Sequence, residues 1–145
     1  MVVGDGPVRK ELEAQAKRLG IGHRLVFTGV LPRAEVPAAA MAFDIALQTA
    51  LVPYASPLCL FEYLALGKAI VAPDQANHRE ILRAGVDALL YEPDGPGDLE
   101  RAIETLVGDE ALRSRLEAGA RETMAARQFT WRRNAERVVE VAARL

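Results

Sequence analysis

The sequence predicts an α/β fold, a Rossmann-like, doubly wound parallel sheet with helices on both faces. Short apolar segments alternate along the chain with segments whose apolar residues recur at helical spacing. Glycine follows several helical segments, as at Gly20 and Gly67, where it is a favoured residue for ending a helix. Strands that alternate with helices pair in parallel through helical crossovers. At 145 residues, we expect a single domain over 1–145.

The predicted strands are short apolar runs bounded by turn-forming residues. In chain order they cover residues 1–3, 25–27, 44–48, 69–73 and 88–91. The predicted helices lie between Pro7 and Gly20, over 35–43, between Pro57 and Gly67, from Asn77 to near Gly85, and in three segments after residue 98, the last entered through Phe129-Thr130-Trp131.

A complete sheet of this type would have one further strand and helix before Met1. We therefore expect an unpaired sheet edge there, with backbone N–H and C=O groups open to pairing. A homodimer, or strand exchange through this edge, is the resulting hypothesis, and light scattering would test it.

The composition is that of a soluble globular protein. Half of the residues (50%) are hydrophobic and 26% are charged, which argues against disorder. No apolar run approaches the roughly 18 to 20 residues that span a bilayer, and no signal segment opens the chain, so a cytoplasmic location is expected. The net charge of -2 gives no indication of nucleic-acid binding. The Arg-rich face of the last helix is interpreted as solvated, with Glu partners, and not as a membrane contact.

Cysteine and histidine are too scarce to build a metal site or a catalytic constellation. Cys59 is the one cysteine, which excludes an intrachain disulfide. It is interpreted as a small, half-buried filler; the alternative is a thiol whose pKa is lowered by a helix start. His23 and His78 are the only histidines, so neither a metal site nor catalytic residues are predicted.

The most informative segment of the sequence is 54–74, where a helix start is followed by a buried strand. Ser56 is predicted to be the N-cap and Pro57 the first helical residue, which would leave the backbone N–H groups of Leu58, Cys59 and Leu60 free. Such a helix start binds phosphate well. Glu62 follows about one and a half turns into the helix, within reach of hydroxyl groups on the same ligand.

The order and spacing of several motifs carry a family resemblance over nearly the whole chain. They are Val3-Gly-Asp-Gly-Pro7, Arg24-Leu-Val-Phe-Thr-Gly29, Phe43-Asp-Ile-Ala-Leu47, Ser56-Pro-Leu-Cys-Leu-Phe-Glu-Tyr-Leu-Ala-Leu-Gly67, Ile70-Val-Ala-Pro-Asp74 and Phe129-Thr-Trp131. With these motifs the chain resembles the C-terminal, nucleotide-sugar-binding domain of the GT-B glycosyltransferases of group 1 (family 4).

The resemblance implies transfer of a sugar from a nucleotide diphosphate sugar to an acceptor, with retained anomeric configuration and with no metal or other cofactor. In the family's Glu-x7-Glu pattern, the second Glu holds the ribose and corresponds to Glu62, whereas the first, which contacts the donor sugar, corresponds to Tyr54. A phenol replaces a carboxylate there, so the sugar contact is expected to be altered. Cys59 stands where related sequences commonly have Lys, which removes a phosphate partner.

Further expectations follow from the same resemblance. The base pocket of the family would place backbone groups of Gly29, Val30 and Leu31 at the nucleobase. At the helix start, Ser56 and the residues Leu58, Cys59 and Leu60 are expected at the diphosphate. The family's phosphate-binding Arg and Lys and its acceptor domain would precede Met1. The isolated chain is therefore expected to bind nucleotide without transferring sugar.

Two other functions remain open at this point. One is a non-catalytic module that binds a nucleotide or nucleotide sugar and self-associates through its unpaired edge; an upstream continuation of the reading frame would argue against it. The other is a GT-B enzyme of another class, such as a sugar-nucleotide epimerase. That chemistry needs additional acid–base side chains, and the two histidines are poorly placed to supply them.

Overall fold

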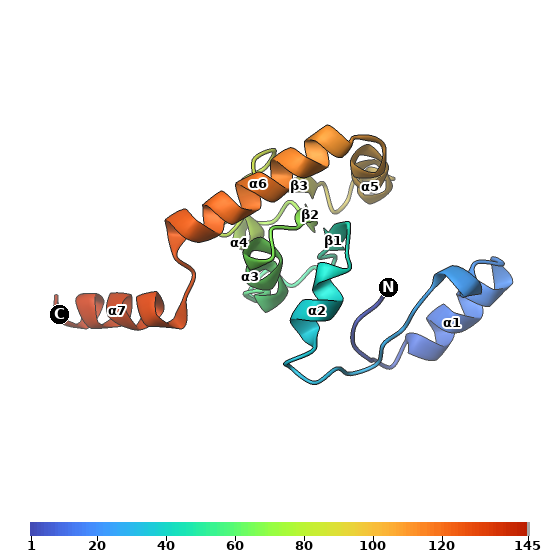
Figure 1. Ribbon diagram of the computed structural model, residues 1–145, viewed down its shortest axis with the longest axis horizontal. Helices are drawn as coiled ribbons and strands as arrows, with labels where there is room; N and C mark the ends of the chain where they lie inside the picture. Colours follow the sequence, from blue (N-terminus) through green and yellow to red (C-terminus); the bar gives the residue numbers. More distant parts are fainter. Residues whose placement is uncertain (145) are drawn as a thin grey trace. The chain divides into compact units, whose positions relative to one another are not determined.

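The computed structural model describes residues 1–144. Contacts within the chain divide it into two compact units, Met1–Phe43 and Asp44–Leu145. Figure 1 labels the helices and strands of both units.

The first unit consists of helices and single bridges. Helix α1 covers Arg9–Arg18, the 3-10 turn η1 covers Gly22–Arg24, and α2 covers Val36–Met41. The strands predicted at 1–3 and 25–27 are wrong as ladders, because the structure has only isolated bridges, Val2 with Phe27 and Gly4 with Gly29. The first bridge is parallel and the second antiparallel, so the two cannot extend into one ladder.

The second unit contains a parallel sheet of three strands in the order β1-β2-β3. Its strands are β1 at Ile45–Leu47, β2 at Ala69–Pro73 and β3 at Ala88–Tyr91. Every residue of the central strand β2 is buried, as expected for a strand covered on both faces. The predicted parallel pairing is thus confirmed, and the bounds predicted for β2 and β3 agree with the structure.

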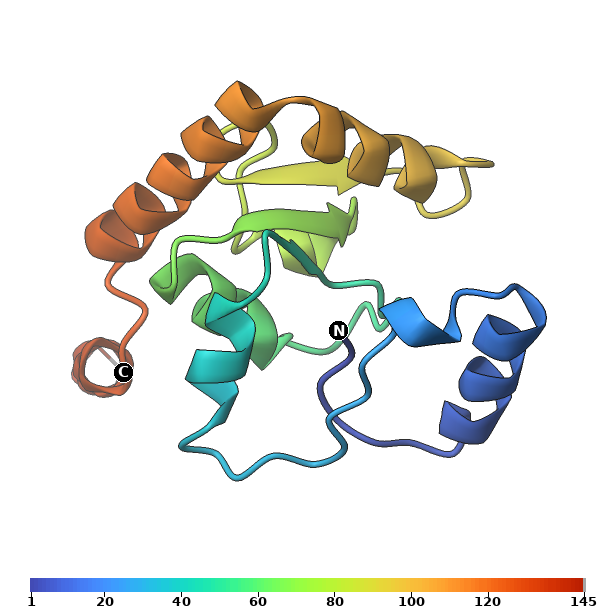
Figure 2. The ribbon, with the colours of Figure 1, turned by 45° about the vertical axis from the view of Figure 1, so that its right-hand side comes forward.

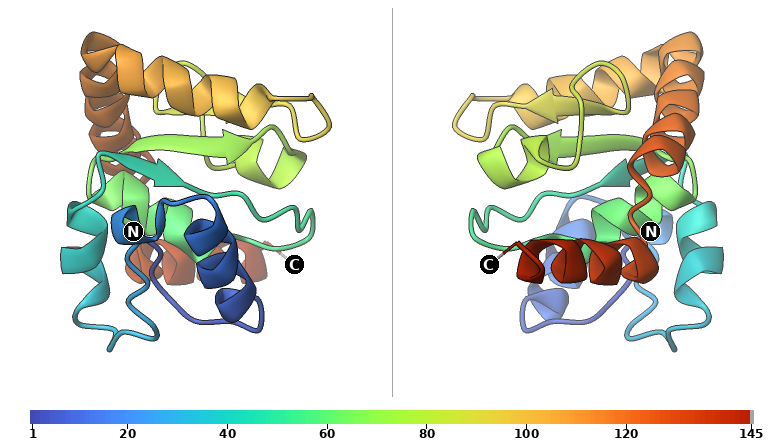
Figure 3. Two further views of the ribbon diagram at one scale, coloured as in Figure 1. Left: turned by 90° about the vertical axis from the view of Figure 1, so that its right-hand side faces the viewer. Right: turned by 90° about the vertical axis from the view of Figure 1, so that its left-hand side faces the viewer.

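In the described part of the second unit, residues 44–144, five helices accompany this sheet. They are α3 (Leu58–Ala65), α4 (Ala76–Arg79), α5 (Asp98–Gly108), α6 (Glu110–Arg127) and α7 (Trp131–Ala142). Figures 2 and 3 show α6 running along the sheet from the end of α5 toward the start of α7.

Alternate residues of β2 enter two separate hydrophobic clusters. Ile70 packs with Leu60 of α3 and with Ala120 of α6 in one cluster. Val71, its neighbour, belongs to a second cluster with Leu106 of α5. Because consecutive side chains of a strand point to opposite faces, helices cover both faces of the sheet. The predicted doubly wound α/β arrangement is confirmed.

A buried polar contact joins the loop before β3 to α6. Asp87 has an exposed fraction of 0%, and its carboxylate accepts hydrogen bonds from the Arg83 backbone N–H at 2.6 Å and from the Thr123 hydroxyl at 2.6 Å. At Gly119, a Cβ atom would lie 1.9 Å from the carbonyl oxygen of Val86. A glycine is therefore needed on α6 for this close approach of two backbones.

Helix α7 follows Thr130, whose hydroxyl accepts a hydrogen bond from the Arg133 N–H at 3.1 Å. None of its residues is buried, and Trp131 is 78% exposed. Arg133 forms ion pairs with Glu136 and Glu140, each at 3.2 Å, so the expected Glu partners are present. Within residues 1–144, no helix combines the length and the apolar character needed to cross a membrane.

Candidate functional site

Helix α3 begins one residue later than the sequence predicts. Its N-cap is Pro57, with φ -73° and ψ 102°, and no side chain caps it. The prediction of Ser56 as N-cap is therefore wrong. Because Pro57 is still extended, the hydroxyl of Ser56 lies one residue too far back to reach the first-turn amides. Leu58, rather than Pro57, is the first helical residue.

The backbone amides at this helix start are not equivalent. The N–H of Leu60 donates to the Pro57 carbonyl at 3.1 Å, so the prediction of a free Leu60 amide is wrong. Within the described residues, the N–H groups of Leu58 and Cys59 have no backbone acceptor. Two amides therefore remain for a ligand at the positive end of the α3 dipole.

Glu62 lies one helical turn beyond these amides. It is exposed, and its carboxylate forms no hydrogen bond or ion pair with any residue in 1–144. It follows Leu58, which is 66% exposed, by four positions, so the two share one open face of α3. The rise along the helix between them is about 6 Å.

Tyr54 lies in a tight turn just before α3. The turn is closed by a hydrogen bond from the Ala55 N–H to the Val52 carbonyl at 3.1 Å, and Tyr54 at its tip is 92% exposed. The structure thus places Tyr54, the exposed Ser56 and the start of α3 in one continuous segment that follows β1.

Asn77 contacts this turn, a contact that the sequence does not predict. Its side-chain amide nitrogen donates to the carbonyls of Val52 at 3.1 Å and Ala55 at 2.8 Å. The sequence indicates only that Asn77 begins a helix, because a contact with backbone carbonyls more than twenty positions away leaves no local pattern.

Cys59 packs as a structural residue. Its thiol is half-buried and donates to the Gln48 side-chain oxygen at 3.3 Å. Burial raises the pKa of the Cys59 thiol, the nearby Glu62 charge raises it further, and the backbone amides of Leu60 and of Cys59 itself oppose this only in part. The interpretation as a half-buried filler is confirmed, and the alternative of a thiol with a lowered pKa is wrong.

The residues expected at the nucleobase lie in the first unit, whereas α3 lies in the second. Gly29 has a left-handed backbone with φ 69°, and the Thr28 hydroxyl donates to its carbonyl at 2.8 Å. Val30 is 81% exposed and Leu31 is half-buried. The backbone turn that the sequence indicates at Gly29 is therefore present, and its role at a base stays a prediction.

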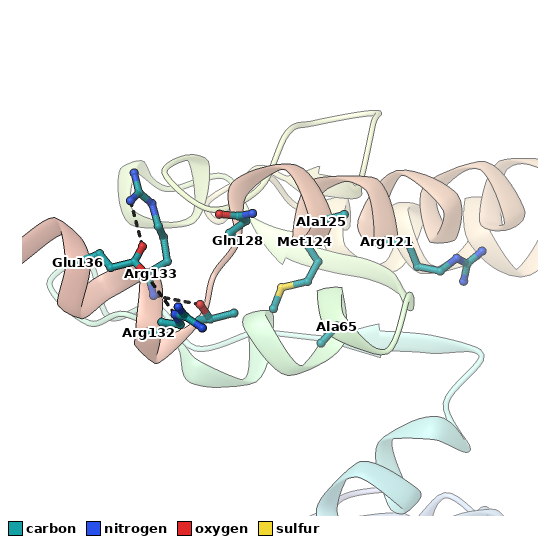
Figure 4. A pocket seen from close by; sticks show the side chains of 9 residues that line it. Ala65, Arg121, Met124, Ala125, Gln128, Arg132, Arg133 and Glu136 are labelled. Atoms are coloured by element: carbon teal, nitrogen blue, oxygen red, sulfur yellow. Dashed lines mark hydrogen bonds and ion pairs between the residues drawn. The ribbon is translucent and has the colours of Figure 1, made fainter.

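A separate cavity of about 590 Å³ lies near Ala65, at the opposite end of α3. Its other lining residues come from α6, from α7 and from the segment between them: Arg121, Met124, Ala125, Gln128, Thr130, Arg132, Arg133 and Glu136. Figure 4 shows Met124 pointing toward Ala65 and the ion pairs of Glu136 with the two neighbouring arginines. None of the predicted site residues lines this cavity.

Metal ligands do not gather in the described part of the chain. Across residues 1–144, no group of three or more His, Cys, Asp and Glu side chains is placed to hold a metal ion.

Comparison with known proteins gives one family. The family model described as "Glycosyl transferases group 1" matches residues 1–123. The chain is 32% identical over 111 residues to a 2-deoxystreptamine glucosyltransferase of Streptomyces kanamyceticus, a match that covers 77% of the chain and 28% of that relative. It is 35% identical over 127 residues to the lipopolysaccharide core biosynthesis glycosyltransferase LpsD of Rhizobium meliloti (strain 1021), over 87% of the chain and 36% of that relative.

Solved structures are similar over almost the whole chain. The structure of Anabaena Alr3699/HepE in complex with UDP superposes with a TM-score of 0.84 at 26% identity, covering 99% of this chain and 40% of that one. The same protein in complex with UDP-glucose gives a TM-score of 0.80 at 27% identity. The chain thus spans less than half the length of each of these three relatives.

Proposed function

Because this chain belongs to the group 1 glycosyl transferases and has the fold of their C-terminal GT-B domain, we propose that it binds a nucleotide diphosphate sugar. In the complete protein this sugar would pass to an acceptor. HepE, which is similar over 99% of this chain, has been solved with UDP and with UDP-glucose, and this supports a donor of the same chemical class.

The observation that carries the proposal is the open face at the start of α3. Within residues 1–144, the N–H groups of Leu58 and Cys59 lack backbone acceptors, and the Glu62 carboxylate, one turn further along the same helix, forms no hydrogen bond or ion pair. In the proposal the two amides and the helix dipole bind the diphosphate. The Glu62 carboxylate accepts hydrogen bonds from the ribose hydroxyls, and such bonds are strong because the acceptor is charged.

The remaining site residues complete the donor contacts. We place Tyr54 at the donor sugar, where its phenol offers one donor and one acceptor in place of a carboxylate. Ser56 lies between Tyr54 and the helix start, where its hydroxyl would reach the diphosphate. Backbone groups of Gly29, Val30 and Leu31 are proposed for the nucleobase. The proposal includes transfer with retained anomeric configuration and without a metal ion, as the family resemblance implies.

Calorimetric titration of the chain with UDP, and with other nucleoside diphosphates, tests the proposal. The variant Glu62→Gln keeps the size of the side chain and removes its charge. Its affinity should fall about 10- to 100-fold, the loss expected when a hydrogen bond to a charged group is removed. Stability should not change, because the Glu62 carboxylate has no partner in the described chain.

The matched control is Glu122→Gln, an exposed glutamate on α6. Its affinity for UDP should equal that of the unmodified chain. A chain that binds no nucleoside diphosphate would overturn the proposed function, and unchanged affinity in Glu62→Gln would remove the ribose role.

A further inference from the structure

The turn that presents Tyr54 is bound from outside by the side chain of Asn77. The Nδ2 group of Asn77 donates to the carbonyl of Val52 at 3.1 Å and to the carbonyl of Ala55 at 2.8 Å. These are the first and last residues of the turn, whose own hydrogen bond joins the Ala55 N–H to the Val52 carbonyl at 3.1 Å. One amide group therefore binds both ends of the turn.

Side-chain packing contributes little to holding the turn in place. Tyr54 is 92% exposed, and Pro53 beside it is exposed as well. Val52 and Ala55 are only half-buried. A turn with so little buried surface is expected to open readily unless hydrogen bonds hold it, and the two bonds from Asn77 are of this kind.

The position of Asn77 connects two loops at one edge of the sheet. Asn77 follows β2, whereas the turn follows β1, and these strands are parallel neighbours. The carboxyl ends of parallel strands meet at the edge where ligands of such folds bind. The contact therefore joins the Tyr54 turn to the segment that follows the fully buried strand β2.

We propose that Asn77 is a positioning residue, which fixes the 52–55 turn through its two carbonyls and thereby sets the place of Tyr54 beside the donor sugar. This inference rests on the proposed function of the α3 start. In this role Asn77 does not contact the ligand. It controls only the part of the binding affinity that the donor sugar contributes.

Two substitutions of Asn77 remove its N–H donor specifically. Asn77→Asp keeps the shape but has no N–H donor, and a carboxylate would face two carbonyl oxygens that can only accept. Asn77→Ala removes the donor without adding charge, and it serves where the aspartate variant does not fold. Arg79→Ala is the matched control, because Arg79 lies on the same helix, is exposed and pairs with Asp74 rather than with the turn.

The first experiment needs no ligand. Amide hydrogen exchange of Ala55, followed by NMR in the full chain, should be faster by about thirtyfold in both Asn77 variants, the factor that corresponds to two lost hydrogen bonds of ordinary strength. The Arg79→Ala variant should exchange at the unmodified rate. Unchanged exchange at Ala55 in the Asn77 variants would overturn the inference.

The second experiment compares UDP with UDP-glucose by calorimetry. In the unmodified chain we expect UDP-glucose to bind more tightly than UDP, and in the Asn77 variants this difference should disappear while UDP affinity stays unchanged. Equal weakening of both ligands, or no sugar contribution in the unmodified chain, would overturn the role at the sugar. If neither ligand binds the unmodified chain, the proposed function fails, and the exchange experiment still decides whether Asn77 holds the turn.

Discussion

His78 carries a buried imidazole in α4, with an exposed fraction of 1%. Burial lowers the pKa of His78, and a hydrogen bond with the Pro73 backbone offsets this only in part. The ordinary histidine pKa of about 6.5 applies in the unfolded chain. Below that pH, His78 therefore binds a proton more readily in the unfolded chain than in the folded chain. The contribution of His78 to the free energy of unfolding should therefore be complete above about pH 6.5, where the imidazole is neutral in both states. The free energy of unfolding should decrease as the pH falls below that value.

Urea unfolding at about pH 7 and about pH 5 measures this effect, and His78→Gln should show a smaller decrease than the unmodified chain. Hydrogen bonding and charge from Arg79 lower the pKa of Asp74. The contribution of Asp74 to the free energy of unfolding is therefore lost only near and below its ordinary pKa of 3.8, outside the range between about pH 5 and about pH 7. His23→Gln, at an exposed position, is the control. An equal decrease in His78→Gln and the unmodified chain would contradict the prediction.

At this scale the sequence identifies the residues whose signal is local. The packing of Cys59 as a half-buried filler follows from its isolation and apolar neighbours, whereas the role of Glu62, inferred from its distance to a helix start, stays a prediction. Ser56 and Pro57 both favour a helix start, and sequence preference does not decide which of the two is still extended, so the predicted N-cap is one residue too early. Asn77 could not be found, because the groups it binds are backbone carbonyls that any residue would supply.

Among the elements, α6 has the strictest packing requirement, at Gly119. A Cβ atom there would overlap the carbonyl of Val86, which belongs to the backbone and has little freedom to move. Gly119→Ala should lower the free energy of unfolding by about 1–3 kcal/mol or more, the range found for overpacked sites. Denaturant unfolding followed by circular dichroism measures the change.

Gly108→Ala, at the end of α5, is the matched control, since a Cβ atom there has no heavy atom within 4 Å. Its effect should be neutral or stabilising by up to about 1 kcal/mol, because alanine favours the helix more than glycine does. Equal effects of the two substitutions would show that the contact with Val86 does not constrain α6.

The elements that the sequence predicts best are those with continuous apolar runs. β2 and β3 occur at the predicted residues because segments 69–73 and 88–91 are apolar and bounded by turn residues. Residues 1–3 and 25–27 have similar composition and yet form single bridges. Composition predicts that a segment can be a strand, whereas a ladder also depends on which segments lie beside it.

For the whole molecule, the distribution of buried surface predicts that α7 contributes little to the stability of the unit that carries it. None of its residues is buried, and Val138 and Val139 are 62% and 68% exposed. A chain that ends after Thr130 should unfold within about 0.5 kcal/mol of the full chain, as expected for changes outside the core. Urea unfolding monitored by circular dichroism tests this.

Phe129→Ala provides the comparison, because the Phe129 ring packs edge-to-face on Phe61 with centroids 5.0 Å apart. Removal of this half-buried ring should lower the free energy of unfolding by about 1–3 kcal/mol. If the truncated chain loses as much stability as Phe129→Ala, α7 packs more closely than its exposure indicates.

At the same scale, the sequence predicts the α/β class and the family because many weak motifs agree in order over the whole chain. The same agreement does not reveal the division after Phe43, which depends on how many contacts cross between segments. The roles predicted for Gly29 and Glu62 therefore come from one family resemblance, although the two residues belong to different units.

Cys59 gives this chain a built-in reporter. As the one cysteine in the sequence, it offers maleimide or iodoacetamide reagents a single point of attachment at the start of α3, and no residue has to be engineered for the purpose. Because the pKa of the thiol is raised, alkylation should be slow near neutral pH and faster in mildly alkaline buffer. A bound diphosphate would shield the sulfur, so the rate of labelling becomes a direct measure of occupancy at this helix start.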